Sequence, residues 1–497
     1  KDRSSTSLAI RSLSIYTYLK SSASASIVDP DQLHIAKVRR SSMDEILVVP
    51  FPHAGHIFPA TQLSAHLARR NYKVTLLLPS SSSASSPPHP LVRIVDFSLP
   101  LTNRIQPQLL EDTLHDLLAG IFQHFGLEHH HDASFPSSLP RKPPLCVIVD
   151  DMISGLIDTC VQHRVPVVSF FTSGACAAAL DHATWELSPE DFASAPLSTA
   201  VTIPDLPAEM ALTTSDISSR HQPFGGPGSV GGPRRRRGIA GADGAVALLV
   251  NTCDELERPF LDYVAKKAGK PTWGVGPLLP DQFWAAAGPV RDGEVRSGHE
   301  FGVDETELVE WLDAKPPRSV IYVSFGSLVS PADDELSQLA AALDESNRPF
   351  LWVMQTKSRK RTEGRGRGMV IRGWAPQLLI LGHPSVGGFV SHCGWNSTVE
   401  ALVCGVPMLT WPVRGDQHHN AKLVVRRLGT GCAIRDSENC SSAAALTKED
   451  VVAGIERVMV DDGIRKRAAS VRAVFAGGFP ESSTSSLDDF LASLSLE

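Results

Sequence analysis

The residues with the clearest chemical potential follow a short apolar run in the second half of the chain. Val386–Ser391 is typical of a buried strand, and it leads directly into His392-Cys-Gly-Trp-Asn-Ser397. Small and apolar residues then continue at helical spacing. A strand, a tight turn at Gly394 and a helix that begins with Asn396 and Ser397 would bind phosphate, because unpaired backbone N–H groups at a helix start attract anions. The imidazole of His392 could reach a phosphate oxygen.

A second set of residues could transfer a proton. His53 and His56 follow the predicted strand Ile46–Phe51 and precede a helical pattern. An imidazole there could deprotonate a hydroxyl group, because its ordinary pKa lies near neutrality. Such a base needs a carboxylate to orient it and to stabilise its charged form. Asp150 and Asp151 end a buried apolar strand and could supply that carboxylate.

Short apolar runs must position these side chains. Strands are predicted in the first half at 46–51, 73–78, 92–97, 145–149, 166–171 and 245–251, and in the second half at 320–324, 350–354, 388–391, 407–411 and 431–434. Helical patterns such as 60–70 and 152–163 separate several of them. Continuous Val/Ile/Leu strands alternating with helices indicate parallel sheets that are covered on both faces. We therefore predict two Rossmann-like α/β halves, with ligands bound at the carboxyl ends of the strands.

Composition excludes several classes of function. The 497 residues are 42% hydrophobic and 20% charged, as in ordinary globular proteins, and their length suits two domains. A net charge of −7 argues against nucleic acid as a partner. No apolar run approaches the roughly 18–20 residues that a membrane span requires. The eight cysteines form no CxxC pair, which favours free thiols in a reducing cytoplasm.

The segment from Trp374 to Gln417 resembles the signature box of the plant family 1 UDP-glycosyltransferases. The resemblance covers all 44 residues without a gap, from the Trp-Ala-Pro-Gln opening through His-Cys-Gly-Trp-Asn-Ser to the Asp-Gln close. It extends more weakly over most of residues 43–497. It implies the GT-B fold, in which two Rossmann-like domains face each other across a cleft.

The resemblance also assigns donor-binding roles by position. Contacts to the uridine are expected from Trp374, Ala375, Gln377 and Glu400, with the indole of Trp374 stacked on the uracil. Contacts to the diphosphate are expected from Ser327, His392, Gly394, Asn396 and Ser397. Contacts to the donor sugar are expected from Thr172, Trp395, Asp416 and Gln417.

The family's Gly-His-(Ile/Val)-x-Pro pattern selects His56 over His53 as the base. Its Cys-(Ile/Val)-x-x-Asp pattern selects Asp150 as the partner of that base, with Asp151 as the adjacent alternative. The resemblance thus implies an inverting transfer that needs no cofactor. No Asp-x-Asp pair stands in a suitable loop, so we expect the transfer to need no metal ion.

The expected division of the chain follows from these assignments. Residues 1–42 are Ser-rich and basic and are expected to be a disordered leader or an artefact, with a transit peptide as the alternative. The other expected parts are an acceptor-binding domain (43–280) with a mobile loop (216–243), a linker (281–303), a UDP-sugar-binding domain (304–475) and a C-terminal helix that packs back on the first domain (476–497). We expect a cytoplasmic monomer.

The expected reaction moves glucose from UDP-glucose to a small apolar aglycone. The resemblance favours glucose, because relatives that prefer galactose often carry His at the position of Gln417. A carboxamide there can donate to and accept from adjacent sugar hydroxyls. The acceptor is expected to be a flavonoid or another phenol, then a terpenoid or steroid, bound near Phe58, Trp185 and Met210. Alternatives are a transferase that uses another UDP-sugar and a binding protein that has lost catalysis. An oxidoreductase lacks support, because no Gly-x-Gly-x-x-Gly follows the first strand.

Overall fold

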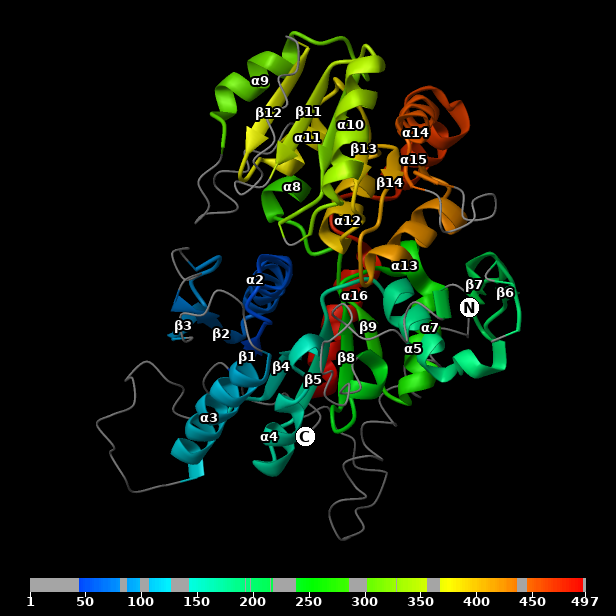
Figure 1. Ribbon diagram of the computed structural model, residues 1–497. Helices are drawn as coiled ribbons and strands as arrows, with labels where there is room; N and C mark the ends of the chain where they lie inside the picture. Colours follow the sequence, from blue (N-terminus) through cyan, green and yellow to red (C-terminus); the bar gives the residue numbers. More distant parts are fainter. Residues whose placement is uncertain are drawn as a thin grey trace, which may run out of the picture.

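The computed structural model describes residues 44–80, 87–98, 107–126, 143–192, 194–196, 198–214, 216–217, 238–285, 302–327, 329–354, 367–435 and 445–494. Two parallel sheets organise this part of the chain, one in each lobe of the molecule (Figure 1). None of its helices is both long enough and apolar enough to cross a bilayer. The expected leader 1–42 lies outside the described residues.

The first sheet has seven strands in the order β3-β2-β1-β4-β5-β8-β9. Their bounds are β1 Glu45–Val49, β2 Lys73–Pro79, β3 Val92–Phe97, β4 Cys146–Asp150, β5 Val167–Phe171, β8 Ala247–Val250 and β9 Thr272–Gly274. All paired neighbours are parallel. Every residue of β4 and β5 is buried, which is what a parallel sheet covered on both faces requires.

Helices cover both faces of this sheet. They are α2 Ala54–Arg69, α3 Pro107–Gly126, α4 Leu156–Gln162, α5 Ala175–Glu186, α7 Asp254–Ala268 and the C-terminal α16 Glu481–Leu494. Side chains of a strand alternate between its two faces, so Ile46 and Val48 of β1 pack in one apolar cluster with α2 and α16, whereas Leu47 and Val49 pack in another with α3, α4 and α5.

The second sheet has six parallel strands in the order β12-β11-β10-β13-β14-β15. They are β10 Val320–Ser324, β11 Phe350–Met354, β12 Gly368–Arg372, β13 Val386–Ser391, β14 Met408–Thr410 and β15 Gly431–Ala433. The helices of this half are α8 Asp281–Ala285, α9 Glu305–Asp313, α10 Asp333–Glu345, α11 Gln377–Gly382, α12 Trp395–Cys404, α13 Gln417–Lys422, α14 Lys448–Val460 and α15 Asp462–Val474. A two-stranded sheet of β6 Ala200–Val201 and β7 Leu212–Thr213 completes the described strands.

Strand order reverses once in each large sheet, between β1 and β4 and between β10 and β13. At such a reversal, the loops that leave the carboxyl ends of the two neighbouring strands run to opposite faces of the sheet. Doubly wound sheets bind ligands in the crevice between these loops. The residues with predicted chemistry follow these strands. The prediction of two α/β halves with parallel sheets is confirmed.

Several predicted boundaries were wrong. Thr272–Gly274 and Gly368–Arg372 are strands that the sequence pattern did not predict. Helix α2 begins at Ala54 and includes Pro59, although the pattern placed its start after that proline. The expected loop 216–243 is packed at both ends, where Ile217 and Ala242 are 0% exposed and Gly238–Gly241 forms a short 3₁₀ helix, while residues 218–237 lie outside the described part.

The C-terminal helix α16 lies beside β9 in the lobe of the first sheet, drawn red in Figure 1. Phe490 is 0% exposed there, and its ring centroid lies 5.6 Å from that of Trp273 in β9. Helix α16, near the end of the chain, therefore covers the sheet that contains β1, near its beginning.

We expect Phe490→Ala to lower the free energy of unfolding by about 3–5 kcal/mol, because it leaves a cavity beside Trp273. Asp488→Ala on the same helix is the matched control: Asp488 is exposed and pairs only at the surface with Arg70, so its loss should cost less than about 1 kcal/mol. Denaturant unfolding of both variants measures the difference. Equal losses would show that α16 contributes nothing through its apolar face.

Candidate active site

The predicted base His56 lies in the first turn of α2, directly after β1. Its Nδ1 is 2.8 Å from Oδ2 of Asp150, the last residue of β4. Strands β1 and β4 pair in parallel with Val49 opposite Val149, so their carboxyl ends meet at one edge of the sheet. Asp150 Oδ1 accepts the backbone N–H of Met152 at 2.9 Å, which fixes the carboxylate. Asp150, rather than Asp151, contacts the imidazole.

The surroundings of His56 set both its tautomer and its charge. An ionised carboxylate only accepts hydrogen bonds, so Nδ1 carries the hydrogen and Nε2 keeps a lone pair. Burial opposes the charged ring, but the negative charge and the hydrogen bond of Asp150, with smaller contributions from Asp151 and Asp416, outweigh it. The pKa of His56 is therefore raised above its ordinary value of 6.5.

Thr172 follows β5, the next strand of the same sheet, and was predicted to touch the donor sugar. Its Oγ1 instead lies 2.8 Å from His56 Nδ1 and can only accept from that N–H. The Thr172 carbonyl accepts from Asn251 at 3.1 Å. The sequence signal for this contact is a hydroxyl directly after a strand that neighbours β4.

His53 has a structural role at the start of α2. Its Nδ1 accepts the backbone N–H of Gly55 at 3.3 Å and so caps the helix. Burial, with the nearby His56 and Arg414, lowers the pKa of His53 to about 4. The imidazole of His53 is therefore neutral at pH 7, and the lone pair of its Nδ1 can accept the Gly55 N–H.

In the second half, β13 leads through His392, Cys393 and Gly394 into α12. Two glycines enclose the imidazole of His392: a Cβ added to Gly326 would lie 2.7 Å from Nε2, and one added to Gly394 would lie 2.5 Å from it. Burial lowers the pKa of His392 to about 4, against a hydrogen bond with the Ser324 backbone. The ring is therefore neutral at pH 7 and would meet a phosphate as a hydrogen-bonding group, without a charge.

The residues predicted to hold the ribose contact one another. Gln377 Nε2 donates to Glu400 Oε2 at 2.7 Å and to Ser397 Oγ at 3.0 Å, and Tyr322 donates to Gln377 Oε1 at 3.0 Å. All four side chains are buried. Trp374, which is half-buried, lies near them in the chain. The structure thus brings Gln377 and Glu400, both predicted to hold the ribose, into contact. Ala375, two residues before Gln377, is buried.

Trp395 was predicted to contact the sugar, but its indole connects the two halves. Nε1, the only hydrogen-bond donor of the ring, donates to the Asn251 carbonyl at 2.7 Å. A Cβ added to Gly174 would lie 2.5 Å from the Trp395 ring, so this loop of the first half packs closely against it. A polar contact from Trp395 to a sugar would have to come from its backbone N–H.

Asn396 forms a second polar link between the halves, and Pro59 explains it. A proline inside a helix has no N–H to donate to the carbonyl four residues earlier, so Pro59 leaves the Gly55 carbonyl of α2 without its helical partner. Asn396 Nδ2 donates to that carbonyl at 3.1 Å. The helix that carries the predicted base is thereby attached to the helix that begins at the predicted phosphate site.

The predicted sugar-binding pair precedes and begins α13. Gln417 Oε1 accepts the backbone N–H groups of Val413 and Arg414, both at 2.9 Å. Its carbonyl oxygen is thus fully used, and only Nε2 can face a ligand. The expectation that this carboxamide both donates and accepts is therefore wrong. Asp416 Oδ2 accepts from Ser173 at 3.0 Å and from Asn420 at 3.1 Å, and Oδ1 has no hydrogen-bond partner among the described residues.

The remaining predicted residues are one donor contact, Ser327, and the three acceptor contacts, Phe58, Trp185 and Met210. Ser327 is exposed just after β10, and Phe58 is half-buried in α2, two residues after His56. Trp185 is 42% exposed but stands at the far end of α5, roughly 15 Å of helix from Ala175. Met210 is 0% exposed. Its side chain therefore presents no surface to an acceptor in this structure, and its assignment as an acceptor contact stays a prediction.

No group of three or more His, Cys, Asp or Glu residues in the described part of the chain is arranged to hold a metal ion.

Comparisons with known proteins agree with this geometry. Residues 302–474 match the family described as "UDP-glucoronosyl and UDP-glucosyl transferase". Scopoletin glucosyltransferase of Nicotiana tabacum is 33% identical over 356 residues, which cover 69% of this chain and 72% of that one. UDP-glucose flavonoid 3-O-glucosyltransferase 7 of Fragaria ananassa is 31% identical over 446 residues, covering 84% and 88%.

A solved structure agrees as well. A UGT transferase from Siraitia grosvenorii, crystallised with UDP, superposes with a TM-score of 0.65 at 26% identity, covering 91% of this chain and 99% of that one. The two sheets therefore form the GT-B fold. The chain belongs to the plant family 1 UDP-glycosyltransferases.

We expect Asn396→Ala to lower the free energy of unfolding by about 1 kcal/mol without nucleotide, because it leaves the Gly55 carbonyl without a partner. In a Pro59→Ala background the loss should be smaller, because the backbone N–H that this substitution restores can donate to the same carbonyl. A double-mutant cycle of denaturant unfolding measures the difference. An equal loss in both backgrounds would contradict the explanation of this contact by Pro59.

Proposed function

We propose that this enzyme transfers glucose from UDP-glucose to a hydroxyl group of a small apolar acceptor, with inversion at the anomeric carbon. The hydrogen bond of 2.8 Å between His56 and Asp150 carries the proposal. Asn396, in the first turn of α12, connects to Gly55, the residue before that base. The proposed base and the proposed anion site therefore lie next to each other, at the contact between the two halves of the chain.

In the proposed reaction, Nε2 of His56 takes the proton of the acceptor hydroxyl as its oxygen attacks the anomeric carbon. Asp150 stabilises the imidazolium that forms, because its carboxylate accepts from Nδ1–H. The bond from the anomeric carbon to the diphosphate oxygen breaks on the opposite face, which inverts the configuration. The leaving diphosphate would be stabilised by backbone N–H groups at the start of α12 and by a hydrogen bond from the neutral His392.

Donor recognition would use two complementary groups. Asp416 has Oδ1 left as an acceptor, and Gln417 has Nε2 left as a donor. Sugar hydroxyls both donate and accept, so one acceptor and one donor on adjacent residues could each take a neighbouring hydroxyl. This division of roles supports recognition of a sugar through two neighbouring hydroxyls.

The acceptor is proposed to be a phenol, with flavonoids first and terpenoids or steroids after them. The names of the two curated relatives, a scopoletin and a flavonoid glucosyltransferase, support phenolic acceptors. We also propose that the reaction needs no cofactor and no metal ion, because a neutral His392 and the α12 N–H groups would stabilise the leaving diphosphate.

A panel of phenolic, terpenoid and steroid acceptors tests the function, with UDP release as the assay and product masses as the readout. UDP-glucose should give a higher kcat/KM than UDP-galactose or UDP-glucuronate, and EDTA should leave the rate unchanged. A higher kcat/KM with another donor would favour a transferase for that sugar. Tight UDP binding with no product from any acceptor would favour a binding protein that has lost catalysis.

We expect His56→Ala to lower kcat by about 10²–10⁴ for an acceptor of ordinary pKa, because it removes a positioned base. Asp150→Asn should also be damaging, whereas Asp151→Asn, which removes no hydrogen bond to His56 and only a smaller electrostatic contribution, is the matched control and should be milder. Steady-state kinetics with calorimetric titration of UDP separate catalysis from donor binding. A greater loss in Asp151→Asn, with folding intact, would move the partner of the base by one residue.

The pH dependence of the same variants has a definite sign. The base acts in its neutral form and its pKa is raised, so kcat/KM should increase with pH through a midpoint above 6.5. In Asp150→Asn the charge that raises the pKa is lost while burial remains, so the midpoint should move to lower pH. An unchanged midpoint would show that another group controls the profile.

A further inference from the structure

Two consecutive hydroxyl groups follow β5 and contact different parts of the proposed machinery. Thr172 Oγ1 lies 2.8 Å from His56 Nδ1, and Ser173 Oγ donates to Asp416 Oδ2 at 3.0 Å. Ser173 belongs to the first half of the chain, whereas Asp416 precedes α13 in the second half. This loop therefore touches both the proposed base and the proposed sugar-binding carboxylate.

The carboxylate of Asp416 is oriented by two donors on the same oxygen. Ser173 supplies one, and Asn420 Nδ2 supplies the other at 3.1 Å. Asn420 is 0% exposed and also donates to the Cys393 carbonyl at 3.0 Å, so its position is set by the turn that precedes α12. With Oδ2 occupied in this way, Oδ1 is the oxygen that can accept from a ligand.

We propose that Ser173 is a positioning residue for the donor sugar and acts through Asp416. The inference rests on the proposed function of Asp416 as a sugar contact. Because Ser173 comes from the other half of the molecule, recognition of the sugar requires both halves, whereas the proposed uridine-binding residues all lie in the second half. Loss of the Ser173 hydroxyl should therefore reduce the part of the binding affinity that comes from the sugar, and leave the affinity for UDP unchanged.

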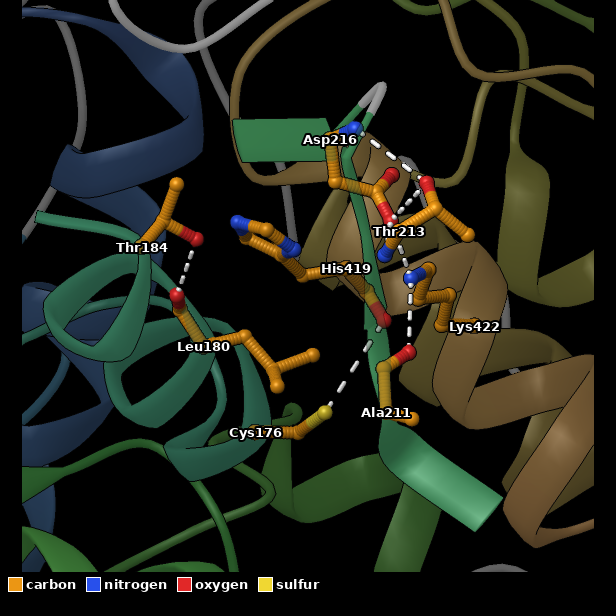
Figure 2. A network of polar contacts seen from close by, with 8 residues as sticks. All are labelled: Cys176, Leu180, Thr184, Ala211, Thr213, Asp216, His419 and Lys422. Carbon is orange, nitrogen blue, oxygen red and sulfur yellow. Dashed lines mark hydrogen bonds and ion pairs between the residues drawn. The ribbon is translucent and has the colours of Figure 1, made fainter. Parts of the chain in front are cut away.

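The rival explanation is a general loosening of the contact between the halves, and a second contact provides the control. Figure 2 shows Lys422, the last residue of α13, against the segment of β7. Its Nζ lies 2.5 Å from Asp216 Oδ2 and 3.1 Å from the Ala211 carbonyl, and Thr213 donates to the same Asp216 oxygen at 2.7 Å. Lys422→Met removes this inter-half contact without touching Asp416.

The experiment measures the affinities of UDP and UDP-glucose by calorimetry for wild type, Ser173→Ala, Ser173→Thr and Lys422→Met. In Ser173→Ala the affinity for UDP-glucose should fall on the order of tenfold, the size of a hydrogen bond to a charged group, while that for UDP stays unchanged. The preference in kcat/KM for UDP-glucose over UDP-galactose should shrink with it. Ser173→Thr keeps a hydroxyl and should retain both. Lys422→Met should lower Tm but leave the ratio of the two affinities as in wild type.

Three results would overturn the inference: an unchanged UDP-glucose affinity in Ser173→Ala, an equal loss for UDP, or the same change of ratio in Lys422→Met. If wild type binds neither UDP nor UDP-glucose, the proposed function fails; if wild type binds both and Ser173→Ala behaves like it, only the inference fails. Should Ser173→Ala melt well below wild type, Ser173→Cys replaces it, because a thiol of similar size is a much weaker donor.

Discussion

The hydrogen bond between His56 and Asp150 demands more of the fold than any other contact in the site. It joins His56, which follows β1, to Asp150, the last residue of β4, so the two strands must pair in parallel, in register, with their carboxyl ends at the same edge. The carboxylate is buried, and a buried charge is costly unless it is paired and hydrogen-bonded. The imidazole N–H and the Met152 amide meet that requirement. A charge that the core would otherwise exclude thus becomes the feature that raises the pKa of the base.

Polar groups at the contact between the halves are satisfied by the opposite half. The Gly55 carbonyl, left open by Pro59, accepts from Asn396, and the Asn251 carbonyl accepts from Trp395. Within the first half, and close to the Trp395 ring, Glu257 is 0% exposed, burial raises its pKa to about 7, and it accepts the first amides of α5. Leaving such buried groups unpaired costs about 1–3 kcal/mol each, so these contacts favour one arrangement of the two sheets.

In the proposed UDP-sugar site, hydrogen bonds within the protein determine which donor and acceptor groups remain for a ligand. The Gln417 oxygen is used by two backbone amides and the Asp416 Oδ2 by two side chains, so one donor and one acceptor are left for a sugar. His392 is held between two glycines and kept neutral by burial. Each of these side chains is held in its orientation by contacts within the protein, which reduces the entropy that binding would cost.

The sequence alone determined the parallel α/β halves, because unbroken apolar strands alternating with helices have few other solutions. The resemblance to the plant family 1 enzymes, and not the residue types by themselves, singled out His56, Asp150 and the box from Trp374 to Gln417. It did not reveal that Thr172 contacts the base, that Ser173 holds Asp416, that Gln417 can only donate or that Met210 is buried. Those properties depend on which atoms lie within hydrogen-bonding distance across two sheets. Local patterns carry strand and helix periods, but only the packing of distant segments decides which lone pairs and N–H groups remain available.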